Sequence, residues 1–298
     1  MKRKLSLGDR SFNVMNGFLF GIFALICFFP FYYIIINTIS DNRMVTRGAI
    51  LFFPQGIHFG NYQEVFRLSG LYEAALISVA RTVSGTLVSV LGSSFMGYAM
   101  SRKEYWHQKF WYRFIIVTMY FNAGVIPVYL NMKNLGLLNN FLVYIIPGLV
   151  SPFNMILVKT YIESIPTSLE ESAEIDGAGY LRRFIQLIMP LAKPIVATIA
   201  IFSAVNQWNS FMDSILYMTG NRFATLQSLL YRYLNEVNSI AELMKSNSSM
   251  TGANLQRTLT PVSVRFTITV ITVLPILLIY PIFQRYFVKG MMIGAVKG

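Results

Sequence analysis

Six stretches of this 298-residue chain contain no Asp, Glu, Lys or Arg over at least about 18 residues, the length at which a helix crosses the hydrocarbon core of a bilayer. Composition agrees, because 54% of the residues are hydrophobic and only 13% are charged, against about 25% in a soluble domain. The sequence therefore predicts an all-α integral membrane protein with six transmembrane helices in contact with lipid. The six stretches are residues 11–40, 82–101, 114–132, 134–158, 194–212 and 266–284.

The distribution of Lys and Arg predicts which helix ends face the cytoplasm. Of the 25 Lys and Arg residues, 15 lie in four segments: 1–10, 102–113, 159–193 and 285–298. Because cytoplasmic loops carry an excess of these residues, we expect all four segments, and so both termini, in the cytoplasm. The long connections 41–81 and 213–265 would then be extracellular. We expect residues 1–298 to form a single transmembrane domain.

Several classes of function find no support in the residues. The net charge of +12 belongs to a strongly apolar chain, so we expect basic loops and no nucleic-acid partner. No Gly-Lys-Ser or Gly-Lys-Thr is present to form a P-loop, so we expect no enzyme here, and ATP hydrolysis would need another polypeptide. One cysteine and two histidines on opposite predicted sides offer no metal site. The uncharged stretches also lack the ionisable relay of a secondary transporter.

The cytoplasmic segment 159–193 is too long for a plain connection and holds five of the 13 acidic residues. Glutamates three residues after Thr167 and after Ser168 could each complete a capping box, which predicts the start of a helix. Gly177 or Gly179 could end this helix in the left-handed conformation. A second helix is expected from Tyr180 to Met189. Spacing alone leaves two interpretations open, a solvated hairpin without a partner and a docking element.

The residues of this hairpin resemble a known motif. Glu171-Ser172-Ala173, then Gly177 after three residues and Leu187-Ile188-Met189-Pro190 after nine more, resemble the EAA loop of ABC importer permeases, E-A-A-x3-G-x9-I-x-L-P. The departures, Ser172, Leu187 and Met189, are conservative in size or polarity. The resemblance implies a cytoplasmic coupling hairpin that contacts an ATPase through six residues: Glu171, Ser172, Ala173, Asp176, Gly177 and Pro190.

Further motifs extend the resemblance over most of the chain. Short stretches are similar to carbohydrate-importer permeases of the maltose-permease type: 59–62, 78–82, 98–102, 136–140 and 208–211. The C-terminal residues 280–298 are similar to the branch named for a lipoprotein-type sugar transporter. The family implies a bacterial cell membrane, a second, non-identical permease subunit, and two cytoplasmic ATPase subunits that bind ATP and magnesium. It also implies an extracellular solute-binding protein and an oligosaccharide as cargo, with a non-sugar solute such as a peptide as the alternative.

Polar residues inside the predicted fifth helix are candidates for the substrate pathway. Amides and an indole are costly when they face lipid, so we expect them to face the helix bundle or a water-filled cavity. Amides can bind sugar hydroxyls and an aromatic face can cover a sugar ring, but hydrogen bonding between helices is an open alternative. The candidates are Asn206, Gln207, Trp208 and Asn209, with Tyr120 and Asn122 on the third helix as weaker ones.

The predicted second helix carries small residues at helical spacing. Such a stripe favours close packing of helices over a role as the wall of a pathway. We expect Arg81, just outside this stretch, to be an anchor whose charge reaches the membrane surface. The stripe consists of Ser78, Thr82, Gly85, Ser89, Ser93 and Gly97.

Overall fold

The computed structural model describes residues 7–68, 70–220, 222–235 and 262–278, and every regular element within these ranges is helical. The chain divides into two compact units, Met1–Leu68 with Tyr233–Val273 and Ser69–Arg232 with Leu274–Gly298. The predicted all-α class is confirmed.

The first unit contains α1 (Leu7–Thr38), α2 (Asn42–Thr46) and α3 (Gly60–Phe66). Its small core is formed by Ile36, Val45 and Ile50, with Tyr32, Val262 and Phe266 packed against it. Asn61 is fully buried and donates to the carbonyl of Thr38 at 2.9 Å, which ties α3 to the end of α1. Asn61, part of the stretch 59–62, therefore serves packing within this unit.

Helix α1 presents large apolar side chains outward along most of its length. Seven of them are between 61% and 69% exposed: Phe12, Phe18, Leu19, Phe20, Phe23, Leu25 and Ile26. Such a surface is unfavourable in water and is expected where a helix faces lipid. The apolar part, Gly8–Thr38, has 31 residues and is long enough to cross a bilayer.

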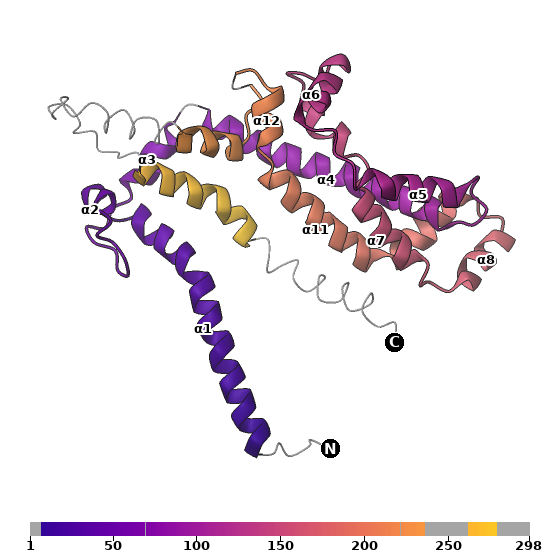
Figure 1. Cartoon of the computed structure of the whole chain (residues 1–298), viewed down its shortest axis with the longest axis horizontal. Coiled ribbons are helices and arrows are strands. Elements are labelled where there is room, and N and C mark those ends of the chain that lie inside the picture. Colours follow the sequence, from indigo (N-terminus) through magenta and orange to yellow (C-terminus); the bar gives the residue numbers. More distant parts are fainter. Residues whose placement is uncertain (1–6, 69, 221, 236–261, 279–298) are drawn as a thin grey trace. The chain divides into compact units, whose positions relative to one another are not determined.

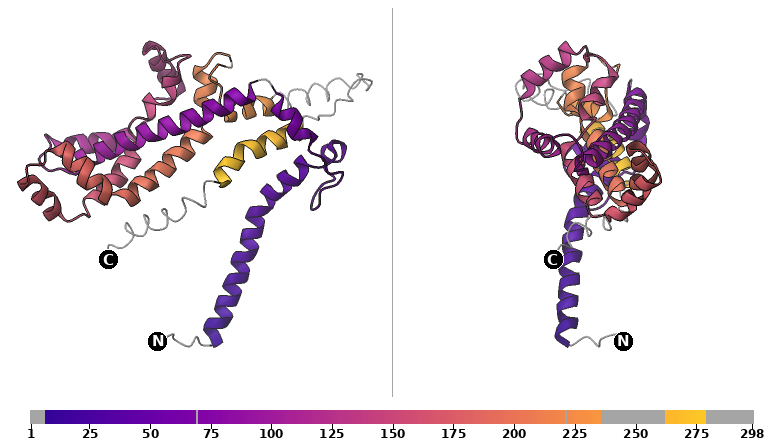
Figure 2. Two further views of the ribbon diagram at one scale, coloured as in Figure 1. Left: turned by 180° about the vertical axis from the view of Figure 1, so that it is seen from behind. Right: turned by 90° about the vertical axis from the view of Figure 1, so that its right-hand side faces the viewer.

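In the second unit, α4 (Leu71–Ser101), α7 (Pro152–Ile162) and α11 (Lys193–Asn209) pack side by side, as Figures 1 and 2 show. Glycines of α4 allow the close approach. A Cβ atom on Gly92 would lie 2.3 Å from the carbonyl oxygen of Leu149, and one on Gly97 would lie 3.0 Å from that of Met155. Gly97 belongs to the predicted stripe of small residues, so the prediction of close packing is confirmed there, whereas Gly92 lies outside the stripe.

The apolar core of this unit joins these three helices to the second half of the segment 159–193. Its buried residues are Val90, Tyr98, Val158, Ile162, Phe184, Ile188, Ala192, Ile195 and Ile199. A second cluster lies around α6 (Val125–Asn134) and α12 (Met212–Tyr217). It contains Met132, Leu137, Val143, Tyr144 and Met218.

The single helix predicted for the stretch 114–132 is interrupted in the structure. It has α5 (Gln108–Thr118), then a break, and then α6. Gly124 immediately precedes α6 with φ +85°, a conformation that an L side chain rarely adopts. A scan for charged residues does not detect such a break, because it tests polarity and not backbone conformation.

The stretch 134–158 is also bent. It contains two short 3₁₀ turns, η1 (Phe141–Tyr144) and η2 (Ile146–Gly148), followed by α7 at an angle of 43°. Of the last stretch, residues 266–278 lie in the apolar helix Val262–Leu278, and residues 279–284 lie outside the described part of the chain.

Two described helices, Gly8–Thr38 and Leu71–Ser101, are each long and apolar enough to cross a membrane. Up to four spans result if each of two bent helix pairs counts as one, the pair ending in α7 and the pair ending in α11. The count of six remains a prediction.

The cytoplasmic hairpin predicted at 159–193 is helical on both sides of its turn. Its first helix is α8 (Thr167–Ile175). The second side is continuous from α9 (Tyr180–Arg182) through the π-helical turns of η3 (Arg183–Ile188) to α10 (Met189–Leu191). An 85° bend then leads into α11. The predicted second helix, Tyr180 to Met189, is confirmed, although part of it is wider than an α-helix.

Candidate functional site

The first candidate region is α8 and the turn that follows it. Gly177 has φ +80°, its N–H donates to the carbonyl of Glu174 at 2.9 Å, and the N–H of Ala178 donates to that of Ala173 at 2.9 Å. These two bonds are those of a Schellman motif, so Gly177, and not Gly179, ends the helix. The same two bonds satisfy carbonyls that the helix end would otherwise leave unpaired.

The capping boxes expected at the start of α8 are not formed. The helix begins at Thr167 after Pro166, and no side chain caps its first turn. Thr167 thus lies inside the helix and not before it. The carboxylate of Glu170, which the box would need, points instead toward α4, where it has other partners.

Most of the residues that the EAA resemblance singles out lie on the surface. Glu171, Ser172, Asp176, Gly177 and Pro190 are exposed. Ala173 is half-buried. Within the described residues, Glu171 and Asp176 form no ion pair, so both carboxylates are available to a partner. Ile175, at 87% exposed, adds an apolar contact on the same short helix.

Glu170 is the exception, because it is buried against the end of α4. Its residue is 6% exposed, its Oε1 accepts a hydrogen bond of 2.7 Å from the hydroxyl of Tyr98, and its Oε2 pairs with the guanidinium of Arg102. Arg102 also lies over the ring of Tyr98, 5.0 Å from its centroid. Both carboxylate oxygens of Glu170 are therefore used within this chain.

A second ion pair lies one helical turn further along α8. Glu174 accepts from Arg183 of η3 at 2.8 Å, and Arg183 is 5% exposed. Burial by itself lowers the pKa of the Arg183 guanidinium, but the charge of Glu174, with Tyr98 and Glu170, raises the pKa above its ordinary value. Arg183 is therefore fully charged, and α8 is attached to the rest of the unit at two points.

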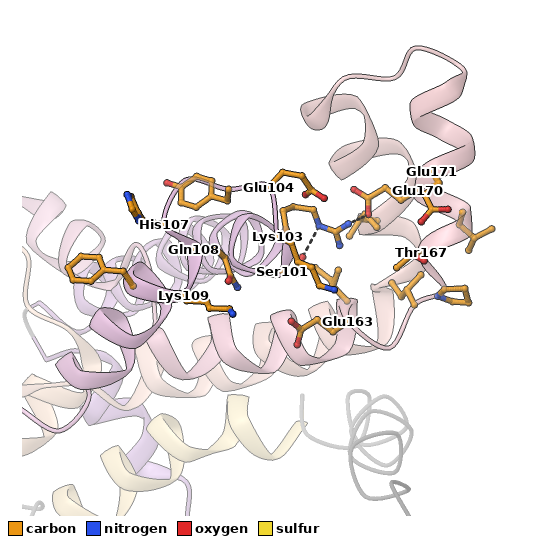
Figure 3. A pocket seen from close by; sticks show the side chains of 18 of the residues that line it. Ser101, Lys103, Glu104, His107, Gln108, Lys109, Glu163, Thr167, Glu170 and Glu171 are labelled. Carbon is orange, nitrogen blue, oxygen red and sulfur yellow. Dashed lines mark hydrogen bonds and ion pairs between the residues drawn. The ribbon is translucent and has the colours of Figure 1, made fainter.

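An open recess of about 1370 Å³ lies beside this attachment, between α8, the ends of α4 and α7, and residues 103–113. Figure 3 shows Glu170 and Glu171 approaching it from α8 and Ser101, Lys103 and Gln108 from the opposite side. Its lining carries charges of both signs, including Arg102, Lys103, Lys109 and Arg113. A partner that enters the recess would have to carry charges complementary to both the acidic and the basic side chains of the lining.

The second candidate region is a smaller cavity of about 280 Å³ between α4, α7 and α11. Its lining is polar and aromatic, with hydroxyls, amides and two phenyl rings. Asn206 and Gln207, both expected in the substrate pathway, belong to it. The other lining residues are Ser89, Gly148, Ser151, Phe153, Asn154, Phe202 and Ser203.

The remaining pathway candidates are not among the residues that line this cavity. Trp208 is half-buried, and Asn209 accepts from Gln227 at 3.3 Å. Tyr120 is 84% exposed, and Asn122 accepts from the N–H of Gly124 at 2.9 Å in the break between α5 and α6. The structure thus brings together two of the six candidates.

Arg81 is not an anchor at the membrane surface, and that expectation is wrong. The residue is 2% exposed inside α4, where it pairs with Asp213 and donates from Nε to Oε1 of Gln207 at 2.9 Å. Its guanidinium lies 4.4 Å from the ring centroid of Tyr144. Because this charge is neutralised inside the unit, α4 starts at Leu71, well before the uncharged stretch.

Sequence reasoning missed the contacts by which Glu170 and Glu174 attach α8 to the partners Tyr98, Arg102 and Arg183. A signal was present, because Tyr98 and Arg102 stand four residues apart at one helix end and Glu170 and Glu174 stand four apart on α8. Spacing indicates which side chains share a face, but it cannot indicate which faces meet. In the part of the chain that the structure describes, no group of three or more His, Cys, Asp or Glu could hold a metal ion.

Comparison with known proteins assigns the family. The family model described as "Binding-protein-dependent transport system inner membrane component" matches residues 89–293. The chain belongs to this family. It is therefore a membrane component of a binding-protein-dependent transport system, and the resemblance of the chain to sugar-importer permeases is confirmed, whereas the coupling role of the EAA-like loop remains a prediction.

Relatives in this family match almost the full chain. The polygalacturonan/rhamnogalacturonan transport system permease protein YtcP of Bacillus subtilis (strain 168) is 34% identical over 97% of this chain and 99% of its own length. Protein LplC of the same organism is 33% identical over 97% and 96%. A chain from the crystal structure of a bacterial ABC transporter involved in the import of the acidic polysaccharide alginate is 32% identical, with a TM-score of 0.83 over 96% of this chain and 100% of that chain.

Proposed function

We propose that this chain is one of two non-identical permease subunits of an ATP-driven importer of oligosaccharides. The observation that carries the proposal is the similarity of nearly the whole chain to permeases named for polygalacturonan and rhamnogalacturonan transport and to a transporter of alginate. Similarity at about a third of the residues over the full length supports a shared transport function as well as a shared fold.

The proposed partners follow from the surfaces described above. Two ATPase subunits would bind ATP and magnesium in the cytoplasm, and one of them would contact α8 through the exposed Glu171, Ser172, Ala173, Asp176 and Gly177 and the nearby Pro190. The exposed carboxylates and Ile175 support this role, because they offer charge and apolar area without a partner in the described chain. A solute-binding protein would deliver the sugar from outside, and both chain termini would be cytoplasmic.

The proposed pathway runs along α11. Asn206 and Gln207 line a cavity whose hydroxyls, amides and two phenyl rings suit a sugar, since amides bond hydroxyls and rings cover C–H faces. Four candidates do not line this cavity and remain weaker: Trp208, Asn209, Tyr120 and Asn122. They would take part only if the pathway formed with the second permease subunit extended to them. Gln207 also hydrogen-bonds to Arg81 and to the carbonyl of Tyr144, whereas the Asn206 amide has no side-chain hydrogen bond within the described residues and is the better candidate.

The test is uptake by the complete transporter. The two permeases, the ATPase and the binding protein are reconstituted in vesicles, and accumulation is measured for oligogalacturonides, alginate oligosaccharides, arabino-oligosaccharides and short peptides. We expect ATP-dependent uptake of at least one oligosaccharide. Uptake of peptides and of no oligosaccharide would replace the proposed cargo with the alternative one. The family assignment would stand in either case.

A further inference from the structure

The attachment of α8 to its unit involves almost no buried apolar surface. Glu170 is the only buried residue in α8. Leu169 is 44% exposed and Ile175 is 87% exposed, so neither holds the helix by burial. The orientation of α8 therefore depends on its polar contacts with the rest of the unit.

Those contacts lie on one face of the helix. Glu170 and Glu174, four residues apart, share this face, and each meets an arginine of a different segment. Arg102 caps the end of α4, and Arg183 begins η3. Exposed Glu171 and Asp176 lie outside this attachment. One helix thus has an inner face fixed to its own chain and an outer face open to a partner.

The contact with α4 is geometrically tight. Glu170 receives both the hydroxyl of Tyr98, at 2.7 Å, and the guanidinium of Arg102. Tyr98 is 3% exposed, and its ring lies 5.4 Å from that of Phe184 in η3, centroid to centroid. A buried carboxylate with two charged or polar donors cannot move away from them without leaving charge unpaired in a poorly hydrated site. This resists any shift of α8 relative to the end of α4.

We propose that Glu170, Tyr98 and Arg102 form a clasp that makes α8 and the inner end of α4 move as one body. The inference rests on the proposed function, in which an ATPase subunit pushes or pulls on the outer face of α8. Glu170 is then a positioning residue: it does not touch the ATPase, but it transfers the displacement of α8 to a helix that lines the cavity at Ser89. Helix α4 also packs against α7 and α11, so its movement would be passed to these two helices.

The decisive measurement is the distance between α8 and α4 in the complete transporter. Spin labels are placed on cysteines at Ser168 of α8, outside the proposed ATPase contact, and at Leu91 of α4, both exposed, in a background in which Cys27 is changed to serine. The distance distribution is recorded without nucleotide and with ATP under conditions that prevent hydrolysis. We expect the same distribution in both states for the native clasp, and a distribution that shifts or broadens with ATP in the Glu170→Gln variant.

A second measurement follows the consequence for coupling. In vesicles that import oligogalacturonides or alginate oligosaccharides, we expect Glu170→Gln to keep ATP hydrolysis within about twofold of the native rate while uptake falls about tenfold or more. Exchange of the two charges, Glu170→Arg with Arg102→Glu, should restore part of the uptake. Glu64→Gln is the control, since it removes a carboxylate from the exposed pair with Arg67 at the end of α3 and should change neither rate.

The outcomes separate the clasp from its alternatives. A change of the α8 to α4 distance with ATP in the native protein, or no change in either protein, overturns the proposal. Loss of uptake and hydrolysis in parallel assigns Glu170 a purely structural role. If Glu170→Gln does not assemble, Tyr98→Phe decides, because it keeps the ring and removes only the hydroxyl donor, and an unchanged ratio of hydrolysis to uptake then overturns the clasp. Failure of the native permease to co-purify with an ATPase would instead overturn the proposed function.

Discussion

Arg81 places a charge inside the 31-residue helix α4 with a side chain that is only 3% exposed. Its partner, Asp213, is 22% exposed and also accepts from Ser210 and from the N–H of Ser214. The pair therefore joins α4 to the first turn of α12. A charge with these contacts stabilises the fold only as long as both partners are present.

We expect Arg81→Gln to destabilise the protein by about 3 kcal/mol, because it leaves the carboxylate of Asp213 partly buried without its cation. The thermal denaturation midpoint of the purified complex and its yield measure the loss. Arg67→Gln is the control, because Arg67 pairs with Glu64 where the side chains are 75% and 40% exposed, and such pairs contribute little. Equal midpoints for both variants would show that the Arg81 pair has no structural role.

Asn206 is the side chain through which the proposed pathway can be tested with little risk to the fold. It is exposed and lines the cavity between α4, α7 and α11. Loss of one hydrogen bond to a neutral sugar hydroxyl corresponds to about 0.5–1.5 kcal/mol, so Asn206→Ala should lower uptake at subsaturating sugar by roughly two- to tenfold per assembled transporter. Asn131→Ala, an exposed asparagine of α6 outside the cavity lining, should leave uptake unchanged. The same uptake in both variants would remove Asn206 from the pathway.

At the scale of elements, substitutions of Gly177 at the end of α8 separate the effect of backbone strain from that of added bulk. Gly177 has φ +80°, and no atom of this chain lies within 4 Å of the position that a Cβ would take. An alanine there costs about 1–2 kcal/mol in backbone strain and adds almost no bulk. A tryptophan adds the same strain and a large ring that only a docked partner could obstruct.

We therefore expect Gly177→Ala to retain co-purification with the ATPase subunits and most of the ATP hydrolysis, and Gly177→Trp to lose both. The comparison of the two variants separates strain from obstruction, and co-purification of the second permease confirms that each variant has assembled. A tryptophan variant that still binds the ATPase and supports full hydrolysis would contradict a docked role for the end of α8.

The sequence predicts elements well where a single local property decides them. Long uncharged stretches located α1 and α4, and the hairpin was located by acids, glycine and proline around α8. The break before α6 depends on the backbone conformation of Gly124, and the start of α4 depends on a charge neutralised by Asp213, 132 residues away. Both are tertiary properties. The same holds for Glu170, whose partners on α4 no spacing rule could identify.

At the scale of the whole molecule, the asymmetry of positive charge is the argument for orientation. Most Lys and Arg residues lie in segments 1–10, 102–113, 159–193 and 285–298, and the cytoplasmic side of membrane proteins carries this excess. The long connection 213–265 is placed outside by the same rule. If the segment 159–193 lay outside the cell, a cytoplasmic ATPase could not reach α8. Orientation and coupling are therefore linked predictions.

Labelling of single cysteines tests this orientation. In a Cys27→Ser background, we place one cysteine at Ser172 on α8 and another at Arg222 in the segment after α12, because both positions are exposed. An impermeant thiol reagent should modify the cysteine at 222 in intact cells, and the cysteine at 172 only after the inner face is opened, because positively charged loops hold α8 inside. A permeant reagent is the control for accessibility and should modify both. Modification of both positions from the same side would place α8 and the connection after α12 on one face of the membrane, which a fifth span between them cannot allow, and the six-helix topology would then be wrong.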